Sequence, residues 1–181
     1  MQAKDILIQL IGLCGTALFF LSYQCRSNRN LFRVQFASYL LYTIHLLLLG
    51  AVTGGVSYVL NTVRSFCLAG RQRFLRSWAM CALLCAMQLA ALAATWGGWL
   101  SVLPVAANIA ATVAGYTYSA KKIRLAGMLL NSPLWIVYDI LVGSWAGILD
   151  EVVSEASMLL SIARFGWKQL DSGEPAQKGM T

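Results

Sequence analysis

The sequence predicts an all-α membrane protein with seven transmembrane helices, arranged as two parallel three-helix repeats joined by a linker helix. Three observations support this prediction. Hydrophobic residues make up 59% of the 181 residues and charged residues only 12%, whereas a soluble domain carries about 25% charge. The chain divides into apolar segments near the length of about 20 residues that a membrane-crossing helix needs. Two groups of three segments also share glycines and polar residues at matching positions.

Each apolar segment is bounded by charged residues or by glycine-containing turns. The seven segments are Ile6 to Tyr23, Phe32 to Leu49, Val52 to Ala69, Trp78 to Ala94, Trp99 to Tyr118, Leu125 to Val142 and Trp145 to Phe165. Only Gly50 and its neighbours separate the second segment from the third, and Gly143 lies at the same place between the sixth and the seventh. Each of these pairs is therefore predicted to form a tight helical hairpin. Residues 169–181 have no apolar run and are predicted to form a disordered cytoplasmic tail.

The basic residues predict how the chain is oriented. They follow the first, third, fifth and seventh segments, as Arg26, Arg29 and Arg33, then Arg71, Arg73 and Arg76, then Lys121, Lys122 and Arg124, and finally Arg164 and Lys168. The loops after the second, fourth and sixth segments contain no Lys or Arg. Because basic loops stay in the cytoplasm, we expect the N-terminus outside and the C-terminus inside.

The net charge of +7 could suggest binding to nucleic acid, but the basic residues lie between apolar runs and not along one polar face. We therefore expect the lipid bilayer to be the partner and expect no nucleic acid. The sequence leaves open whether copies of the chain form a homo-oligomer.

A shift of 93 residues superposes the two groups of three segments. It pairs Gly50 with Gly143, Gly54 with Gly147, Tyr23 with Tyr116, and Arg71 with Arg164. Residues 1–76 are therefore predicted to form the first three-helix unit, residues 77–98 the linker transmembrane helix, and residues 99–168 the second unit. Because one extra crossing separates the units, they have the same orientation, a symmetry that is found in transporters.

Polar residues inside the apolar segments are candidates for an intramembrane charge site. Ser57, Asn61 and Arg64 share one helical face, and Asp150, Ser154 and Ser157 have the same spacing in the seventh segment. An arginine at the bilayer centre costs roughly 3 kcal/mol, so Arg64 needs a partner. Our first choice for an ion pair is Glu155, and the alternatives are Glu151, Asp150 and Asp139. Such a cluster is either a solute or proton site, or a structural ion pair between two bundles.

A second set of residues predicts a binding pocket. Asn131, Trp135 and Asp139 follow one another at one-turn intervals along the sixth segment. We expect a small polar solute to bind between the two units, at a pocket lined by Asn61, Arg64, Asn108, Asn131, Trp135, Tyr138 and Asp139. Hinges or kinks are predicted at Gly50, Gly54, Pro104, Pro133, Gly143 and Gly147.

The sequence has no signature of an enzyme or of a bound cofactor. Its one histidine, His45, is expected to be a packing residue, and its five cysteines show no paired C-x-x-C spacing. We therefore predict no catalytic residue, no metal and no cofactor.

Several stretches resemble the YgjV family of bacterial inner-membrane proteins: GTALFFLSYQ at Gly15 to Gln24, LLGAVTGGVSYVLNTVRS at Leu48 to Ser65, LPVAANIAAT at Leu103 to Thr112, NSPLWIVYDILVGSWAG at Asn131 to Gly147, and IARF at Ile162 to Phe165. The likeness spans nearly the whole chain and implies a multi-pass protein of the bacterial inner membrane.

The layout of three, one and three helices is also similar to that of the SWEET sugar carriers and of the PnuC-type nicotinamide riboside carriers. That similarity would imply passage of a small polar solute between two bundles. Neither unit has the PQ dipeptide, since Leu40 and Pro133 occupy the superposed positions. We expect a transporter or facilitator. The alternative is a non-transporting membrane component that stabilises a partner or senses the state of the envelope.

Overall fold

The computed structural model describes residues 3–171, and within this range every regular element is a helix. The α-helices are α1 (Ala3–Tyr23), α2 (Asn28–Leu48), α3 (Val52–Ala69), α4 (Trp78–Ala94), α5 (Val102–Tyr116), α6 (Ala120–Ala126), α7 (Ser132–Val142) and α8 (Trp145–Asp171). Short 3-10 turns, Phe74–Arg76 and Trp99–Ser101, precede α4 and α5. A π turn, Gly127–Asn131, joins α6 and α7 into one segment. The described residues thus form the seven helical segments that were predicted.

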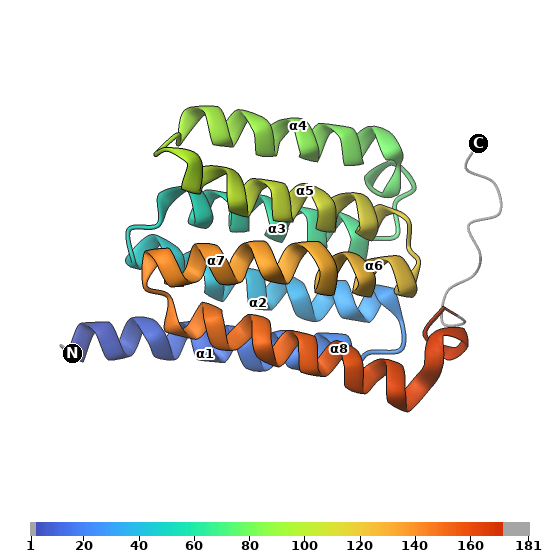
Figure 1. The fold of residues 1–181 in the computed structure, drawn as a ribbon. Helices are drawn as coiled ribbons and strands as arrows, with labels where there is room; N and C mark the ends of the chain where they lie inside the picture. Colours follow the sequence, from blue (N-terminus) through green and yellow to red (C-terminus); the bar gives the residue numbers. More distant parts are fainter. Residues whose placement is uncertain (1–2, 172–181) are drawn as a thin grey trace.

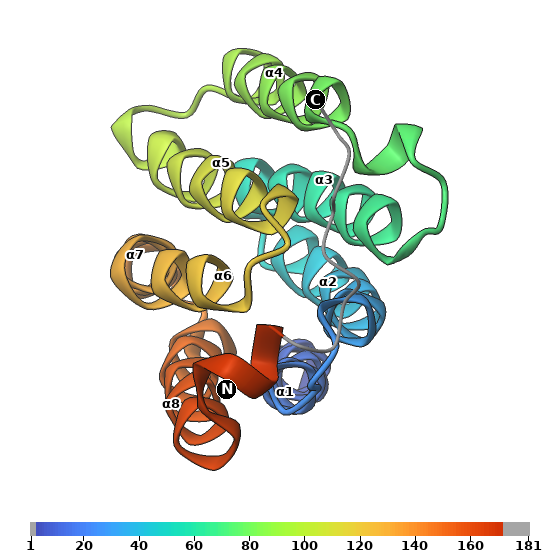
Figure 2. The same ribbon diagram turned by 90° about the vertical axis from the view of Figure 1, so that its right-hand side faces the viewer.

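The helices run roughly along a common direction and alternate in orientation (Figure 1). Viewed along that direction, α1, α2 and α3 form one row, and α8, the α6–α7 segment and α5 form a second row beside it (Figure 2). At one end of the rows α1 packs against α8, and at the other end α3 packs against α5. Helix α4 lies outside both rows, against α3 and α5.

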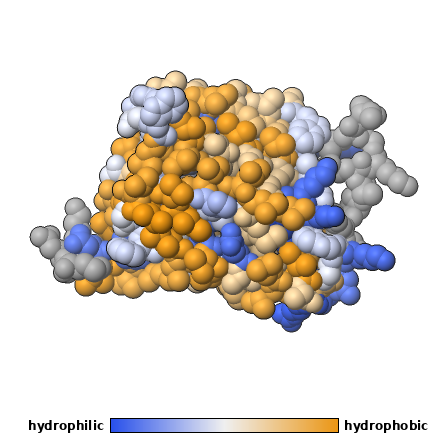
Figure 3. All heavy atoms as spheres, in the orientation of Figure 1, coloured by the Kyte–Doolittle hydropathy of each residue, from blue (hydrophilic) through white to orange (hydrophobic). Residues whose placement is uncertain are grey.

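The outer surface of these helices is apolar. Large hydrophobic side chains are exposed on many helices, among them Leu7, Phe66, Leu129 and Leu141, each at least 60% exposed. Figure 3 shows a broad apolar face across the middle of the molecule. Soluble monomers rarely expose contiguous apolar patches of this extent. The surface is therefore suited to lipid.

Four helical segments are long and apolar enough to cross a membrane: Asp5–Tyr23, Asn28–Leu48, Trp99–Tyr116 and Ala120–Val142. Helix α4 is apolar but shorter, at 17 residues. Helices α3 and α8 carry charged residues, and Arg64, Asp150 and Glu151 are nevertheless less than 5% exposed. The crossing of the membrane by α3, α4 and α8 stays a prediction.

The basic residues that were expected in loops lie at the end of the molecule where α1, α3, α5 and α8 finish, on the right in Figure 1. Arg124 is an exception. It is fully buried, and its guanidinium donates to the Ser161 hydroxyl at 2.9 Å and to the Tyr23 carbonyl oxygen at 3.1 Å. The reason is that the sixth helical segment begins at Ala120, earlier than the expected Leu125, so Arg124 lies inside a helix that packs against α8.

The chain beyond the seventh segment also differs from expectation. The backbone of α8 bends at Gly166, which has a φ of 65°, and continues to Asp171. Leu170 is buried and packs in a small cluster with Ala120 and Phe165. The predicted disorder is therefore wrong for residues 169–171, because an apolar contact holds them against α6. Residues 172–181 lie outside the described residues.

Both predicted hairpins turn at a glycine in the left-handed region. Gly50 has a φ of 77° and Gly143 a φ of 74°, a conformation in which other residues are strained.

The two predicted proline kinks differ from each other. Pro104 lies in the first turn of α5, where the missing N–H costs no intrahelical hydrogen bond. Pro133 lies two residues after the π turn, so the break in that segment spans Gly127 to Pro133.

Candidate functional site

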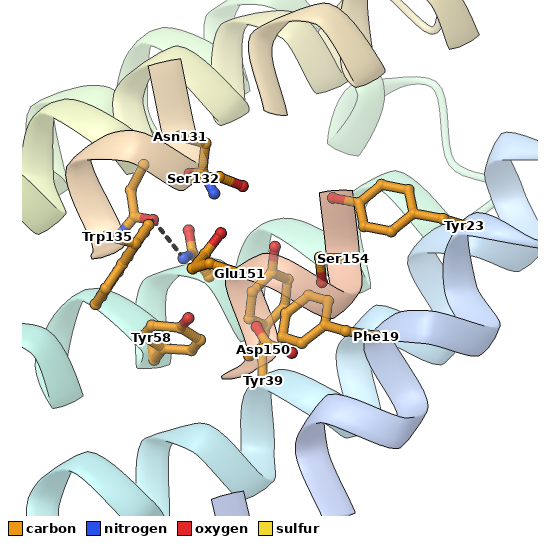
Figure 4. Close-up of a pocket in the computed structure, with 12 residues that line it drawn as sticks. Phe19, Tyr23, Tyr39, Tyr58, Asn131, Ser132, Trp135, Asp150, Glu151 and Ser154 are labelled. Atoms are coloured by element: carbon orange, nitrogen blue, oxygen red, sulfur yellow. Dashed lines mark hydrogen bonds between the residues drawn. The ribbon is translucent and has the colours of Figure 1, made fainter. Parts of the chain in front are cut away.

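A small internal cavity lies between the two rows of helices (Figure 4). Its volume is about 20 Å³, which is room for about one water molecule. The residues that line it are Phe19 and Tyr23 of α1, Tyr39 of α2, Tyr58 and Asn61 of α3, Asn108 of α5, Asn131 of the π turn, Ser132 and Trp135 of α7, and Asp150, Glu151 and Ser154 of α8. Both rows therefore contribute to its wall, whereas α4 does not.

Four polar groups in this wall have an atom without a hydrogen-bond partner. They are the Asn61 Oδ1, the Asn108 Nδ2, the Asp150 Oδ1 and the Ser154 Oγ. Each of the four residues is at most 4% exposed. Because nearly all buried polar atoms in proteins are hydrogen-bonded, a group of unsatisfied atoms around one cavity indicates a place for water, an ion or a ligand.

The side chains of Asn61, Asn108 and Trp135 join three helices across one side of the cavity. The Asn61 Nδ2 donates to the Asn108 Oδ1 at 2.7 Å, and the Trp135 Nε1 donates to the same oxygen at 3.3 Å. This arrangement connects α3, α5 and α7 through side chains that the sequence had placed in one pocket. These hydrogen bonds leave the Asn61 Oδ1 and the Asn108 Nδ2 available to an occupant of the cavity.

Aromatic rings form much of the remaining wall. The rings of Tyr58 and Trp135 have centroids 4.7 Å apart, those of Tyr39 and Tyr58 5.4 Å, and those of Phe19 and Tyr39 4.8 Å, all in edge-to-face arrangements. Phe19, Tyr39 and Tyr58 were not among the pocket residues predicted from the sequence. For Tyr58 a signal existed, since it lies one turn before Asn61 on the same face of α3.

Two consecutive carboxyl groups of α8 complete the site. The Asp150 carboxyl lies beside the hydroxyls of Thr16 and Tyr42, and the Glu151 carboxyl lies beside the Ser132 hydroxyl. Asp150 is 3% exposed and Glu151 is 4% exposed. Burial of two carboxyl groups at adjacent positions is costly, so their presence favours a functional role over simple packing.

A family model for a bacterial inner membrane protein, Imp-YgjV, matches residues 6–169. The chain belongs to the Imp-YgjV family. The match includes every residue that lines the cavity. No curated protein and no solved structure matches the chain.

In this Imp-YgjV protein, Arg64 forms none of the ion pairs that were expected. Its Nη2 donates to the Tyr39 hydroxyl at 2.6 Å, its Nη1 donates to the Thr112 hydroxyl at 3.5 Å, and its guanidinium lies 5.3 Å from the centroid of the Tyr39 ring. The expectation was wrong because α3 packs against α2, α4 and α5, whereas α8, which carries Glu151 and Glu155, packs against α1, α6 and α7. Arg64 does not line the cavity, but its hydrogen-bond partners Tyr39 and Thr112 connect it to the wall, since Tyr39 lines the cavity and the Thr112 hydroxyl donates to the carbonyl oxygen of Asn108.

The predicted pocket residues divide into two groups in the Imp-YgjV structure. Asn61, Asn108, Asn131 and Trp135 line the cavity. Tyr138 and Asp139 lie closer to the two hairpin turns. The Tyr138 hydroxyl accepts a hydrogen bond from the Gly54 N–H at 3.1 Å, and Asp139 packs directly against Gly147. The predicted hinge glycines Gly54 and Gly147 are thus tight packing points.

Proposed function

We propose that this protein transports or facilitates the passage of a small polar solute across the bacterial inner membrane, with the central cavity as the solute site. The observation that carries the proposal is the set of unpartnered, buried polar atoms on Asn61, Asn108, Asp150 and Ser154, which surround one cavity. Buried polar groups without partners cost about 1–3 kcal/mol each. An occupant that satisfies several of them would offset that cost.

The arrangement of the rows supports a transporter with two parallel repeats. Under the 93-residue shift, α1 corresponds to α5 and α8 corresponds to α3. The contact of α1 with α8 then corresponds to the contact of α5 with α3, as a two-fold axis along the membrane normal requires. In this proposal the seven helical segments all cross the membrane, with the basic end in the cytoplasm, and α4 is the linker between the repeats.

The size of the cavity supports an occluded state. A volume of about 20 Å³ accepts little more than one water molecule, so a larger solute enters only when the rows move apart. The π turn Gly127–Asn131 interrupts one helix of the second row beside the cavity. Such turns occur often at functional sites, and we infer that the segment bends here when the cavity opens.

The test uses two serines that differ only in their position relative to the cavity. The hydroxyl oxygens of Ser154 and Ser57 are both buried and unpartnered, but only Ser154 lines the cavity. Neither Ser154→Ala nor Ser57→Ala should destabilise the protein, because each removes a polar atom without a partner. We expect Ser154→Ala to lower solute uptake into proteoliposomes and Ser57→Ala to leave it unchanged, with amines, sugars, nucleosides and organic anions as the panel.

Two outcomes would contradict the proposal. Equal uptake by both variants would show that the cavity is not part of the solute pathway. If folded wild-type protein moved no solute of the panel, the chain would instead be a non-transporting component that stabilises a partner or senses the envelope.

A further inference from the structure

We infer that the central cavity recognises a cation, namely the primary ammonium group of a small amine. This inference rests on the proposed function, since it names the class of solute for that same site. Three features carry it: the charge of the wall, its aromatic rings, and the number of free hydrogen-bond acceptors.

The ionisable groups in the wall of the cavity are acidic apart from Tyr phenols. Asp150 and Glu151 both line it, and Asp139 is buried one helix away at 3% exposure. The guanidinium of Arg64 does not line the cavity, and its hydrogen bonds go to Tyr39 and Thr112. An anionic solute would therefore meet carboxyl groups in a water-poor site, which is strongly unfavourable. A cation would neutralise them.

The aromatic rings favour the same sign of charge. Phe19, Tyr39, Tyr58 and Trp135 form a continuous series of ring contacts along the wall, with centroid distances of 4.7 to 5.4 Å. The face of an aromatic ring is electronegative, and ammonium groups bind within about 6 Å of ring centroids. Aromatic rings together with carboxyl groups are a common means of recognising organic cations, whereas a hard ion such as Na⁺ prefers oxygen ligands alone.

The free acceptors match a primary ammonium group in number. Three of the four unpartnered atoms in the wall accept hydrogen bonds, namely the Asn61 Oδ1, the Asp150 Oδ1 and the Ser154 Oγ, and the fourth, the Asn108 Nδ2, is a donor. A primary ammonium group has three N–H donors and no acceptor. A quaternary ammonium has no donor and would leave all three acceptors unsatisfied. The volume of about 20 Å³ is close to that of one ammonium group, so the carbon part of a larger amine requires the cavity to widen.

The experiment compares four small probes: methylammonium, tetramethylammonium, the neutral acetamide and the anion acetate. Binding is measured on purified protein by thermal shift, and transport is measured as uptake into proteoliposomes. We expect methylammonium to bind and to be taken up, and acetamide and acetate to do neither. Asp150→Asn should weaken methylammonium binding by at least about tenfold, because a charge-assisted hydrogen bond is lost.

Glu155→Gln is the matched control, since it removes one carboxyl charge from the same helix at a residue that does not line the cavity. Its affinity for methylammonium should stay within about twofold of the wild type. Ser154→Ala is the second variant, and it keeps the test valid if Asp150→Asn does not fold. We expect it to weaken methylammonium binding as well.

The outcomes separate this inference from the proposed function. Uptake of acetamide or of sugars without methylammonium would overturn the cation but leave a transporter. Binding of tetramethylammonium as tight as that of methylammonium would overturn the role of the three acceptors. Uptake of no probe and of no other polar solute would overturn both proposals.

Discussion

The two hairpins of the molecule, α2–α3 and α7–α8, make the same turn but complete it differently. Each turns at a glycine with a φ near 75°, and four residues later each has a second glycine, Gly54 or Gly147, against which a side chain of α7 packs. In α7–α8 the start of α8 is capped locally, since the Gly147 N–H donates to the Ser144 hydroxyl at 3.0 Å. In α2–α3 the residue that corresponds to Ser144 is Ala51, which has no hydroxyl.

The missing cap in the first hairpin is supplied by the other row. The Gly54 N–H donates to the Tyr138 hydroxyl of α7 at 3.1 Å. One hairpin therefore completes its own turn, whereas the other depends on a side chain from the opposite row. The difference indicates that the contact between the rows near Gly54 is part of the folded unit, and the following substitutions test it.

Gly54→Ala should have the largest effect. A Cβ at this position would lie 2.7 Å from the Tyr138 hydroxyl oxygen and 2.8 Å from its ring, so the ring must move and the capping bond is lost. We expect a loss of about 3 kcal/mol in unfolding free energy, as for other overpacked sites, measured by denaturant unfolding in detergent. Gly97→Ala is the control, because its Cβ would meet nothing closer than 3.5 Å. Equal effects of the two substitutions would show that the rows are not in tight contact here.

Asn108→Ala should have an intermediate effect. It leaves the Asn61 Nδ2 and the Trp135 Nε1 without their shared acceptor in a buried site. We expect destabilisation by about 2 kcal/mol, the cost of unsatisfied buried donors. The exposed Asn30, whose Oδ1 accepts from Arg33, provides the control Asn30→Ala. A cost below about 0.5 kcal/mol for Asn108→Ala would mean that this network does not hold α3, α5 and α7 together.

Tyr138→Phe should have the smallest effect and distinguishes the two hairpins most sharply. It removes the acceptor for the Gly54 N–H while keeping the ring, so we expect a loss of about 1 kcal/mol, as for a helix N-cap. Ala51→Ser would restore in the first hairpin the local cap that Ser144 provides in the second. The double variant should therefore recover most of the loss in unfolding experiments. Strict additivity of the two changes would contradict this account of the cap.

The fold was largely predictable from sequence because the apolar segments and the hairpin glycines are local signals. Gly50 and Gly143 were identified as turns from their position between apolar runs, and both have the left-handed backbone. The start of the sixth segment was misplaced because Lys121, Lys122 and Arg124 suggested a loop. In the structure they lie in α6, where Arg124 is buried by contacts with α8 and α1.

The site was predictable only where one helical face contained the signal. Asn61, Asn108, Asn131 and Trp135 were selected as polar or amphipathic residues inside apolar segments, and they line the cavity. The partner of Arg64 depended on which helices are neighbours, and helical periodicity does not contain that information. Phe19 and Tyr39 were missed for the same reason, because an aromatic residue in an apolar segment has no distinguishing pattern until the rows are assembled.

The most direct test of the central claim is the accessibility of Ser154 from the two sides of the membrane. The five native cysteines are replaced by alanine, Ser154→Cys is introduced, and the membrane-impermeant reagent methanethiosulfonate ethyltrimethylammonium is applied to spheroplasts and to inside-out vesicles. A cavity that opens alternately to each side predicts labelling in both preparations, with protection by methylammonium. Val59→Cys, at a residue that is 43% exposed on the apolar outer surface, is the reference that should stay unlabelled. Labelling of Ser154→Cys in neither preparation would contradict a solute pathway between the rows.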